Sequence, residues 1–376
     1  MVRLSRRERD AAPALTLLAG VTAALVWSAL DGAGYQRVVN RSWIPLTSLG
    51  IGSVHDLVAQ GAMAVFFVAV GFELKREYAR GALHHWRHAI PASLGAVGGM
   101  AAPAALAIGI GLLTRTPALV HGWGIPMSTD VAFTLGVVGL LARGAPPTLR
   151  VFLLTLAIAD DVLGVVVLTV AGSSHLRPGY LVLAAAVVGA SVLLGRRHAP
   201  ASLITVAIAA LWLTLAAARL EPVLAGVIVG LATPADTGAE RIETWATRVS
   251  TVLALPLFAL VSTGVDWSTL SGRGSTGTIV ITTLVARIVG KVVGIVGGVA
   301  LARRLGAPPP SSLPVRLVAA AAVPCAIGFT VPLLFLRADF SPSSSTYAAF
   351  TVALVVTTVV ATLLAAPSLR GALRRR

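Results

Sequence analysis

The sequence is poor in charged residues, in cysteine and in lysine. Only 12% of its 376 residues are charged and 56% are hydrophobic, whereas soluble domains carry about 25% charged residues. This balance excludes an ordinary soluble enzyme. The single cysteine, Cys325, excludes an internal disulfide and a cysteine metal cluster. The apolar runs are continuous and mostly about 17–25 residues long rather than alternating, which excludes a membrane β-barrel and favours transmembrane helices.

We therefore expect an all-α polytopic membrane protein that forms a single transmembrane domain over residues 1–376. A segment near 34–56 contains WIPLTSLGIGS and predicts either a small outer hairpin or an interfacial turn. The first span follows an Arg-rich start but is too long for a signal peptide, so we expect it to be retained. The twelve predicted spans lie near residues 12–32, 57–75, 89–113, 120–142, 150–172, 179–195, 201–218, 222–233, 249–265, 277–302, 317–336 and 345–367.

The net charge of +15 follows the predicted topology. Most of the 30 lysines and arginines fall in alternate loops and at the two ends, which the positive-inside rule assigns to the cytoplasm. Both termini are then cytoplasmic. The basic charge indicates membrane orientation and not nucleic-acid binding, so the expected partners are membrane lipid and small cations.

Two predicted spans contain helix-breaking residues at their middle. The span at 120–142 carries WGIPMSTDVAF with Pro126, and the span at 317–336 carries AVPCAIGFTVPLL with Pro324 and Pro332. Proline removes a backbone donor, and unwound backbone inside a membrane is tolerated only next to protein or a water-filled cavity. Each broken span is the middle of three, so residues 89–172 and 277–367 predict two repeats of opposite orientation, as in secondary transporters. The alternative is that these prolines only kink packed helices.

Four ionisable side chains lie deep inside apolar runs, namely Asp130, Asp160, Asp161 and Lys291. One such charge at mid-bilayer costs roughly 2.5–3.5 kcal/mol, so a chain that keeps four has a use for them. Asp160 and Asp161 are adjacent and point about 100° apart on a helix. Two carboxylates this close in a low dielectric do not both ionise freely, so they can hold either a proton or a small cation. The alternative is a structural pair satisfied by hydroxyl groups.

Lys291 is notable because the chain contains only two lysines. Arginine is always charged, whereas a buried lysine can lose its proton, so Lys291 is expected to be a titratable partner of a carboxylate. A static salt bridge is the alternative. Asp130 is expected to balance the ends of the broken helices or to bind the ion directly. The role of Arg287, one turn before Lys291, is left open between snorkelling and pairing with a carboxylate.

Charged residues also gather at the predicted cytoplasmic ends of two spans. Glu73 and Arg76 end the second span, and Glu243 opens the ninth. They predict either an entry funnel that attracts cations and responds to pH, or ordinary loop charge.

The strings MAVFFVAVGFELKRE, IPMSTDVAFTLGVVGLL, LAIADDVLG, LAGVIVG, GKVVGI and CAIGFT resemble, in order and over nearly the whole chain, the NhaA-type sodium/proton antiporters of bacterial inner membranes. That family is itself a known example of inverted repeats. The resemblance implies that Asp160 and Asp161 bind Na⁺ and protons. It also implies that Thr129 and Asp130 sit at two crossed discontinuous helices, and that Lys291 is the charge partner of Asp160 or of the helix ends.

The resemblance further implies electrogenic export of Na⁺ or Li⁺ in exchange for a larger number of protons, for sodium and pH homeostasis, without a cofactor. It implies activation at alkaline pH and a homodimer formed through the first outer hairpin. The sequence departs from the family pattern at Gln60, Glu221, Thr244 and Thr247 and in DDVLG, which leaves the activation pH open. The rival interpretations are an intramembrane aspartyl protease, which needs its aspartates on separate helices, and a channel or sensor. We expect a transporter rather than an enzyme.

Overall fold

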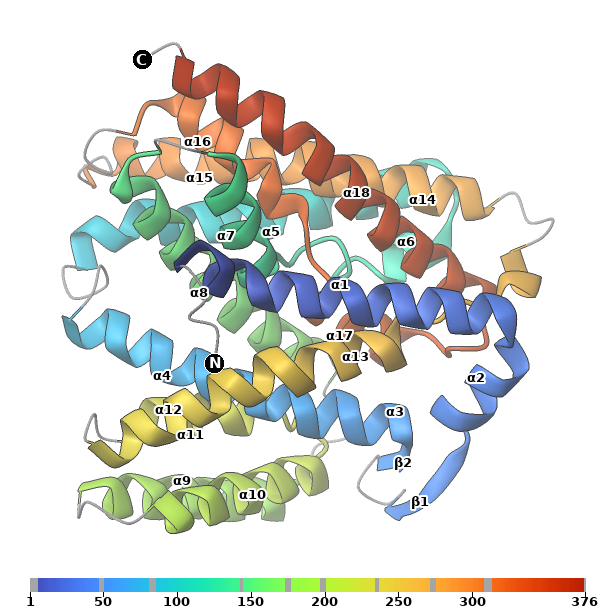
Figure 1. Ribbon diagram of the computed structural model, residues 1–376, viewed down its shortest axis with the longest axis vertical. Coiled ribbons are helices and arrows are strands. Elements are labelled where there is room, and N and C mark those ends of the chain that lie inside the picture. Colours follow the sequence, from blue (N-terminus) through green and yellow to red (C-terminus); the bar gives the residue numbers. More distant parts are fainter. Residues whose placement is uncertain are drawn as a thin grey trace. The chain divides into compact units, whose positions relative to one another are not determined.

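The computed structural model describes residues 6–46, 51–80, 86–142, 145–172, 177–196, 201–233, 237–270, 275–307 and 313–374. The chain divides into two compact units. The first contains residues 1–15, 82–164 and 265–376, and the second contains residues 16–81 and 165–264. The described residues are almost entirely helical (Figure 1). This confirms the predicted all-α class, and the prediction of a single transmembrane domain stays a prediction.

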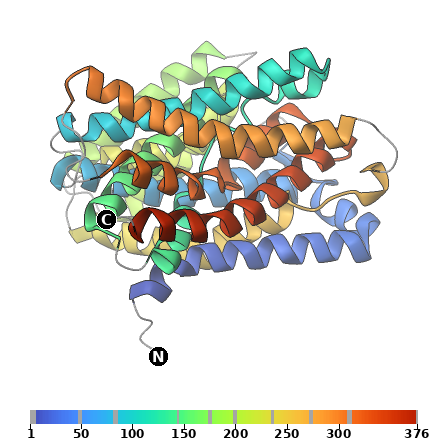
Figure 2. The ribbon, with the colours of Figure 1, turned by 90° about the horizontal axis from the view of Figure 1, so that it is seen from above.

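The first unit is built on four long helical segments and two interrupted ones. In Figure 2, α5 lies beside the run formed by α14, η6 and α15, and these elements also contact one another closely. Its elements are α5 (Trp86–Leu113), α6 (Pro117–His121), α7 (Val131–Leu141), most of α8 (Pro147–Gly172), η5 (Trp267–Leu270), α14 (Ser275–Val285), the π-helical turn η6 (Ala286–Gly290), α15 (Lys291–Arg304), α16 (Val315–Ala322), the 3₁₀ turn η7 (Pro324–Ala326), α17 (Thr330–Asp339) and α18 (Ser345–Arg374).

Glycines allow α5 and α15 to pack closely. Ideal Cβ atoms built on Gly98 and Gly294 would each collide with the carbonyl oxygen of the other residue. Gly298 approaches Leu94 in the same way. Helices in a membrane associate through small residues that let their backbones come together. A larger side chain at Gly98 or Gly294 would therefore push α15, which begins at Lys291, away from α5.

The second unit contains the helical hairpin of α9 and α10, which lie side by side in Figure 1, and the closely packed pair α4 and α11. Its core includes Val68, Phe72, Leu211 and Val229. Its elements are α1 (Arg6–Leu30, from residue 16 onward), α2 (Gly32–Val39), β1 (Ser42–Leu46), β2 (Ile51–Ser53), α3 (Val54–Leu57), the π-helical turn η2 (Val58–Ala62), α4 (Met63–Arg80), α9 (Pro178–Arg196), α10 (Ala201–Ala218), α11 (Leu224–Ala232), α12 (Thr237–Val249), the π-helical turn η4 (Ser250–Ala254) and α13 (Leu255–Ser262).

Of the two alternatives for WIPLTSLGIGS, the structure contains the hairpin. Strands β1 and β2 pair antiparallel, with Ser42 opposite Ser53 and Leu46 opposite Ile51. The preceding helix α2 is fixed by the buried Tyr35, whose hydroxyl donates to the Leu260 carbonyl at 2.8 Å and accepts from the Gly264 amide at 3.1 Å. The hairpin is thus held on a well-anchored helix.

Among the described residues, seven helices are long and apolar enough to cross a membrane, or eight if the bent pair Val315–Ala326 and Thr330–Asp339 counts as one span. Two shorter apolar helices, Gly179–Leu193 and Ser202–Ala218, correspond to the sixth and seventh predicted spans. The predicted spans at 120–142 and 222–233 correspond to the interrupted pair α6 and α7 and to the nine-residue α11. The chain is thus a multi-pass helical protein, and the count of twelve stays a prediction.

Candidate functional site

Two helices of the first unit are interrupted where the sequence predicted. The first break comprises residues 122–130 between α6 and α7, and the second comprises residues 323–329 between α16 and α17. The two halves at the second break are bent by 50°. Pro126 and Pro324 lie within the breaks, where a missing amide hydrogen does no harm, whereas Pro332 falls in the first turn of α17, which tolerates proline.

The two breaks are hydrogen-bonded to each other. The Asp130 amide donates to the Ile327 carbonyl at 2.9 Å, and the Thr129 hydroxyl donates to the Cys325 carbonyl at 2.7 Å. Buried backbone groups need such partners because no water replaces them. Residues about 200 positions apart in the sequence therefore form one polar centre inside the first unit.

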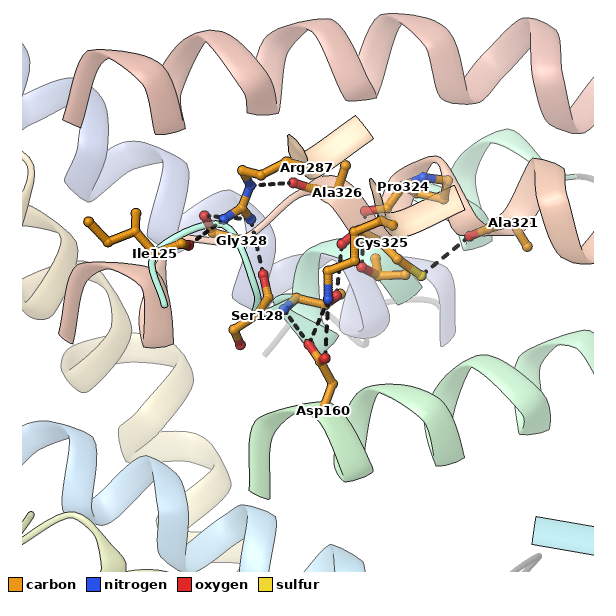
Figure 3. Close-up of polar contacts among 12 residues, drawn as sticks. Ile125, Ser128, Asp160, Arg287, Ala321, Pro324, Cys325, Ala326 and Gly328 are labelled. Atoms are coloured by element: carbon orange, nitrogen blue, oxygen red, sulfur yellow. Dashed lines mark hydrogen bonds and ion pairs between the residues drawn. The ribbon is translucent and has the colours of Figure 1, made fainter. Parts of the chain in front are cut away.

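Asp160 and Asp161 lie on α8 and are both fully buried. The Asp160 carboxylate accepts a short hydrogen bond from the Thr129 amide and two from the Lys291 ammonium, at 3.1 and 3.2 Å (Figure 3). Asp161 follows on the next helical position and so points in another direction. The structure thus brings together Asp160, Lys291 and Thr129.

Lys291 is fully buried at the start of α15, directly after the π-helical turn. The ideal Cβ of Gly99 on α5 would lie 3.6 Å from the Lys291 Cδ, so the alkyl chain passes over a glycine. Its ammonium forms an ion pair with Asp160. Desolvation of two buried charges offsets most of their mutual attraction, so such a pair adds little net stability, whereas removing one partner is costly.

Asp130 is 1% exposed and occupies the N-cap position of α7. Its backbone is extended, with φ of −96° and ψ of 112°. A carboxylate at a helix N-terminus is stabilised by the positive end of the helix dipole. This position fits the predicted balancing role.

Arg287 is a residue whose role the sequence left open. It is fully buried in the π-helical turn and donates to four main-chain carbonyls. Its lack of exposure rules out snorkelling to the surface. The sequence showed a charged residue in an apolar run, one turn before Lys291, and this indicated that Arg287 has a function. Its carbonyl partners come from two segments that are distant in the sequence, so local spacing could not predict them.

The charged residues Glu73, Arg76 and Glu243 come together in the second unit. Arg76 forms a 2.6 Å ion pair with Glu243 and lies 3.8 Å from Glu73. Lys75 donates to the Thr233 carbonyl nearby. The Arg76 side chain is 56% exposed, so this pair is solvated. The three residues lie close together, and their role in ion entry or pH sensing stays a prediction.

The fold and the buried charges define a multi-pass membrane protein with an ionisable centre at two interrupted helices. A family model described as Na⁺/H⁺ antiporter 1 matches residues 5–369. The chain therefore belongs to the NhaA family of Na⁺/H⁺ antiporters. Among its relatives is "Na(+)/H(+) antiporter NhaA 2" of Frankia alni, which is 34% identical over 96% of this chain and 76% of its own length.

Two further bacterial relatives have similar identity. "Na(+)/H(+) antiporter NhaA" of Mycolicibacterium smegmatis is 35% identical over 96% of this chain and 86% of the relative. "Na(+)/H(+) antiporter NhaA 2" of Novosphingobium aromaticivorans is 34% identical over 90% of this chain and 88% of the relative. The predicted family resemblance is thus confirmed over nearly the whole chain.

Proposed function

We propose that this chain is a secondary active antiporter that exports Na⁺, and also Li⁺, in exchange for a larger number of protons. The names of its relatives support Na⁺/H⁺ exchange. The observation that carries the proposal is the buried Asp160–Lys291 pair with Asp161 beside it on the same helix. Carboxylates that must be charged to hold a cation and neutral to hold a proton make binding of the two competitive.

The charge of the polar centre supports this competition. The fully buried acidic and basic side chains among the described residues of the first unit are three carboxylates, Asp130, Asp160 and Asp161, and two cations, Arg287 and Lys291. With all five ionised, the centre carries one negative charge. One proton on Asp161 neutralises it, and loss of a second proton from the Asp160–Lys291 pair would leave two negative charges, which favours a cation in place of the two protons.

The proposed cycle uses two proton carriers. With the centre open to the cytoplasm, Na⁺ binds at Asp161 and Asp160 while protons leave Asp161 and the Asp160–Lys291 pair. The site then faces outward, and protons displace Na⁺. Because two protons replace one Na⁺ in this cycle, exchange is electrogenic and the membrane potential contributes to sodium export.

The arrangement of the spans in the membrane follows from the same function. We propose twelve spans with cytoplasmic termini in the bacterial inner membrane, and inverted repeats over 89–172 and 277–367 whose discontinuous helices cross. The hydrogen bonds between the two breaks support that crossing. Glu73, Arg76 and Glu243 would form the cytoplasmic entry that responds to pH, and the hairpin near 34–56 would join two copies of the chain.

Transport in everted membrane vesicles tests this function. A pH gradient is imposed, and Na⁺, Li⁺ or K⁺ is added at fixed pH values from about 6.5 to 9, the range in which near-neutral groups titrate. Dissipation of the gradient by Na⁺ and Li⁺ is expected, with acceleration when the membrane potential adds to the driving force. If neither ion gives a response at any pH, the assignment fails.

A further inference from the structure

Arg287 is the largest fully buried side chain of the described residues. It lies within the span Ser275–Arg304, in the π-helical turn η6. Arginine stays protonated under physiological conditions, and an uncompensated ion inside a protein costs several kcal/mol. The residues that surround this charge must therefore supply a strong and specific set of hydrogen-bond acceptors.

The acceptors are four main-chain carbonyls, two from each helix break. From the first break, Ile125 accepts from Nη1 at 3.0 Å and Ser128 from Nη2 at 3.1 Å. From the second break, Ala326 accepts from Nε at 3.0 Å and Gly328 from Nη2 at 3.3 Å. Figure 3 shows the guanidinium between these carbonyls. A planar group with five N–H donors can bind four acceptors at once, whereas the three donors of a lysine ammonium cannot.

One of these carbonyls connects Arg287 directly to the ion site. The Ser128 carbonyl and the Thr129 amide belong to the same peptide group, and the Thr129 amide donates to the Asp160 carboxylate. A single rigid peptide plane therefore links the guanidinium on one side to Asp160 on the other. Hydrogen bonds in such a chain polarise one another, so the arginine strengthens the amide as a donor.

The close approach also explains a glycine at position 328. An ideal Cβ there would lie 2.7 Å from the Ser128 carbonyl oxygen and would also collide with the Arg287 guanidinium. Only a residue without a side chain lets both breaks reach the same guanidinium.

We propose that Arg287 is a positioning residue for the ion site. It holds the Ser128–Thr129 peptide so that the Thr129 amide faces Asp160, and it supplies the fixed positive charge for the carbonyls of both breaks. Lys291 is then left to pair with Asp160 alone. This inference rests on the proposed antiport, because Asp160 is a cation ligand only in that function.

The test compares Arg287→Met, Arg287→Lys and the unchanged chain in the same everted vesicles. The apparent KM for Na⁺ and the maximal rate are measured at several pH values. Without the guanidinium the Ser128–Thr129 peptide is no longer held toward Asp160, and weakening a buried hydrogen bond to a charged ligand should raise the KM for Na⁺ by about tenfold or more. The Lys variant keeps the charge without the fork and should recover only part of this loss. The matched control is Arg303→Met, which removes an arginine-to-carbonyl contact with Leu313 farther along the same span.

The possible outcomes separate the two proposals. A KM change confined to the Arg287 variants supports the positioning role, and an equal change in Arg303→Met contradicts it. An unaltered KM and pH profile in Arg287→Met also contradict it. If the unchanged chain shows no exchange with Na⁺, the proposed antiport itself fails.

A second variant covers the case in which Arg287→Met does not fold. Gly328→Ala displaces the same carbonyls while keeping the arginine, and Gly297→Ala is its control because a Cβ there meets nothing within 4 Å. Gly328→Ala should raise the KM for Na⁺ and weaken the protection that Na⁺ gives against thermal unfolding. Values equal to those of Gly297→Ala would overturn the proposal.

Discussion

The buried centre of the first unit and the charged cluster of the second unit each contain a carboxylate paired with a basic side chain, but one pair is buried and the other is partly exposed to solvent. In the buried centre, Asp160 and Lys291 are fully inaccessible, and main-chain groups complete their surroundings. In the charged cluster, Arg76 and Glu243 form a shorter ion pair, yet the Arg76 side chain is 56% exposed. Water screens the second pair and leaves each partner tolerable alone. Burial, and not the length of an ion pair, therefore decides how much stability is lost when one partner is removed.

The largest expected effect is at Asp161. Asp161→Asn keeps the size of the side chain but removes the charge that would hold Na⁺ and the group that would carry a proton. Exchange in everted vesicles should be abolished while folded protein, measured by thermal unfolding after purification, is retained. Asp266→Asn is the control, since Asp266 only caps a local turn with Ser268. Retained sodium coupling in the Asp161 variant would move the ion site elsewhere.

Replacing the basic residue of each ion pair tests the effect of burial directly. Lys291→Met leaves Asp160 buried without its ion-pair partner and should destabilise the protein by about 3–5 kcal/mol. Arg76→Met, in the exposed pair, should change stability by only about 0–1 kcal/mol. Thermal midpoints in detergent measure both. Equal shifts for the two variants would refute the role given to burial.

A smaller change is expected from Lys291→Arg. The positive charge beside Asp160 is kept, but arginine does not release its proton. We expect exchange to continue with an altered dependence on pH, recorded as the maximal rate from about pH 6.5 to 9. Complete loss of exchange would instead favour a cycle that needs deprotonation of the lysine.

The smallest effect concerns Glu221, which precedes α11 outside the membrane-spanning helices. Burial raises the pKa of its carboxyl from 4.5 to about 7. Because the folded pKa lies above the unfolded one, the folded state keeps its proton longer, and stability falls as pH rises from 4.5 to about 7. Glu221→Gln should remove this decline in the thermal midpoint. Parallel curves for the two chains would contradict it.

The sequence predicted the features that have a local chemical cause. Pro126 and Pro324 located both helix breaks, and the charges in apolar runs located Asp130, Asp160, Asp161 and Lys291. Arg287 was visible for the same reason, but its role was not. Its partners are carbonyls, which every residue carries, and no side-chain pattern indicates which carbonyls meet one guanidinium.

The sequence also predicted one helix to be longer than it is. The segment at 222–233 is apolar throughout, but its helix α11 has only nine residues. The hydrophobicity of a segment indicates how favourably it enters the lipid bilayer. The length of a helix depends instead on the residues that begin and end it and on the elements that pack against it. Pro222 and Val223 form a turn before α11, and Thr233 lies just after it, so composition alone overestimates the length of this helix.

The donor that faces Asp160 is a main-chain amide, and this affects how the site can change by mutation. Every residue except proline supplies the same N–H at position 129. Substitutions at this position can remove the hydroxyl group and its hydrogen bond to the Cys325 carbonyl. They leave the hydrogen bond from the main-chain amide to Asp160 in place. The hydrogen bond between the amide of residue 129 and Asp160 therefore depends on the backbone conformation and not on which side chain occupies that position.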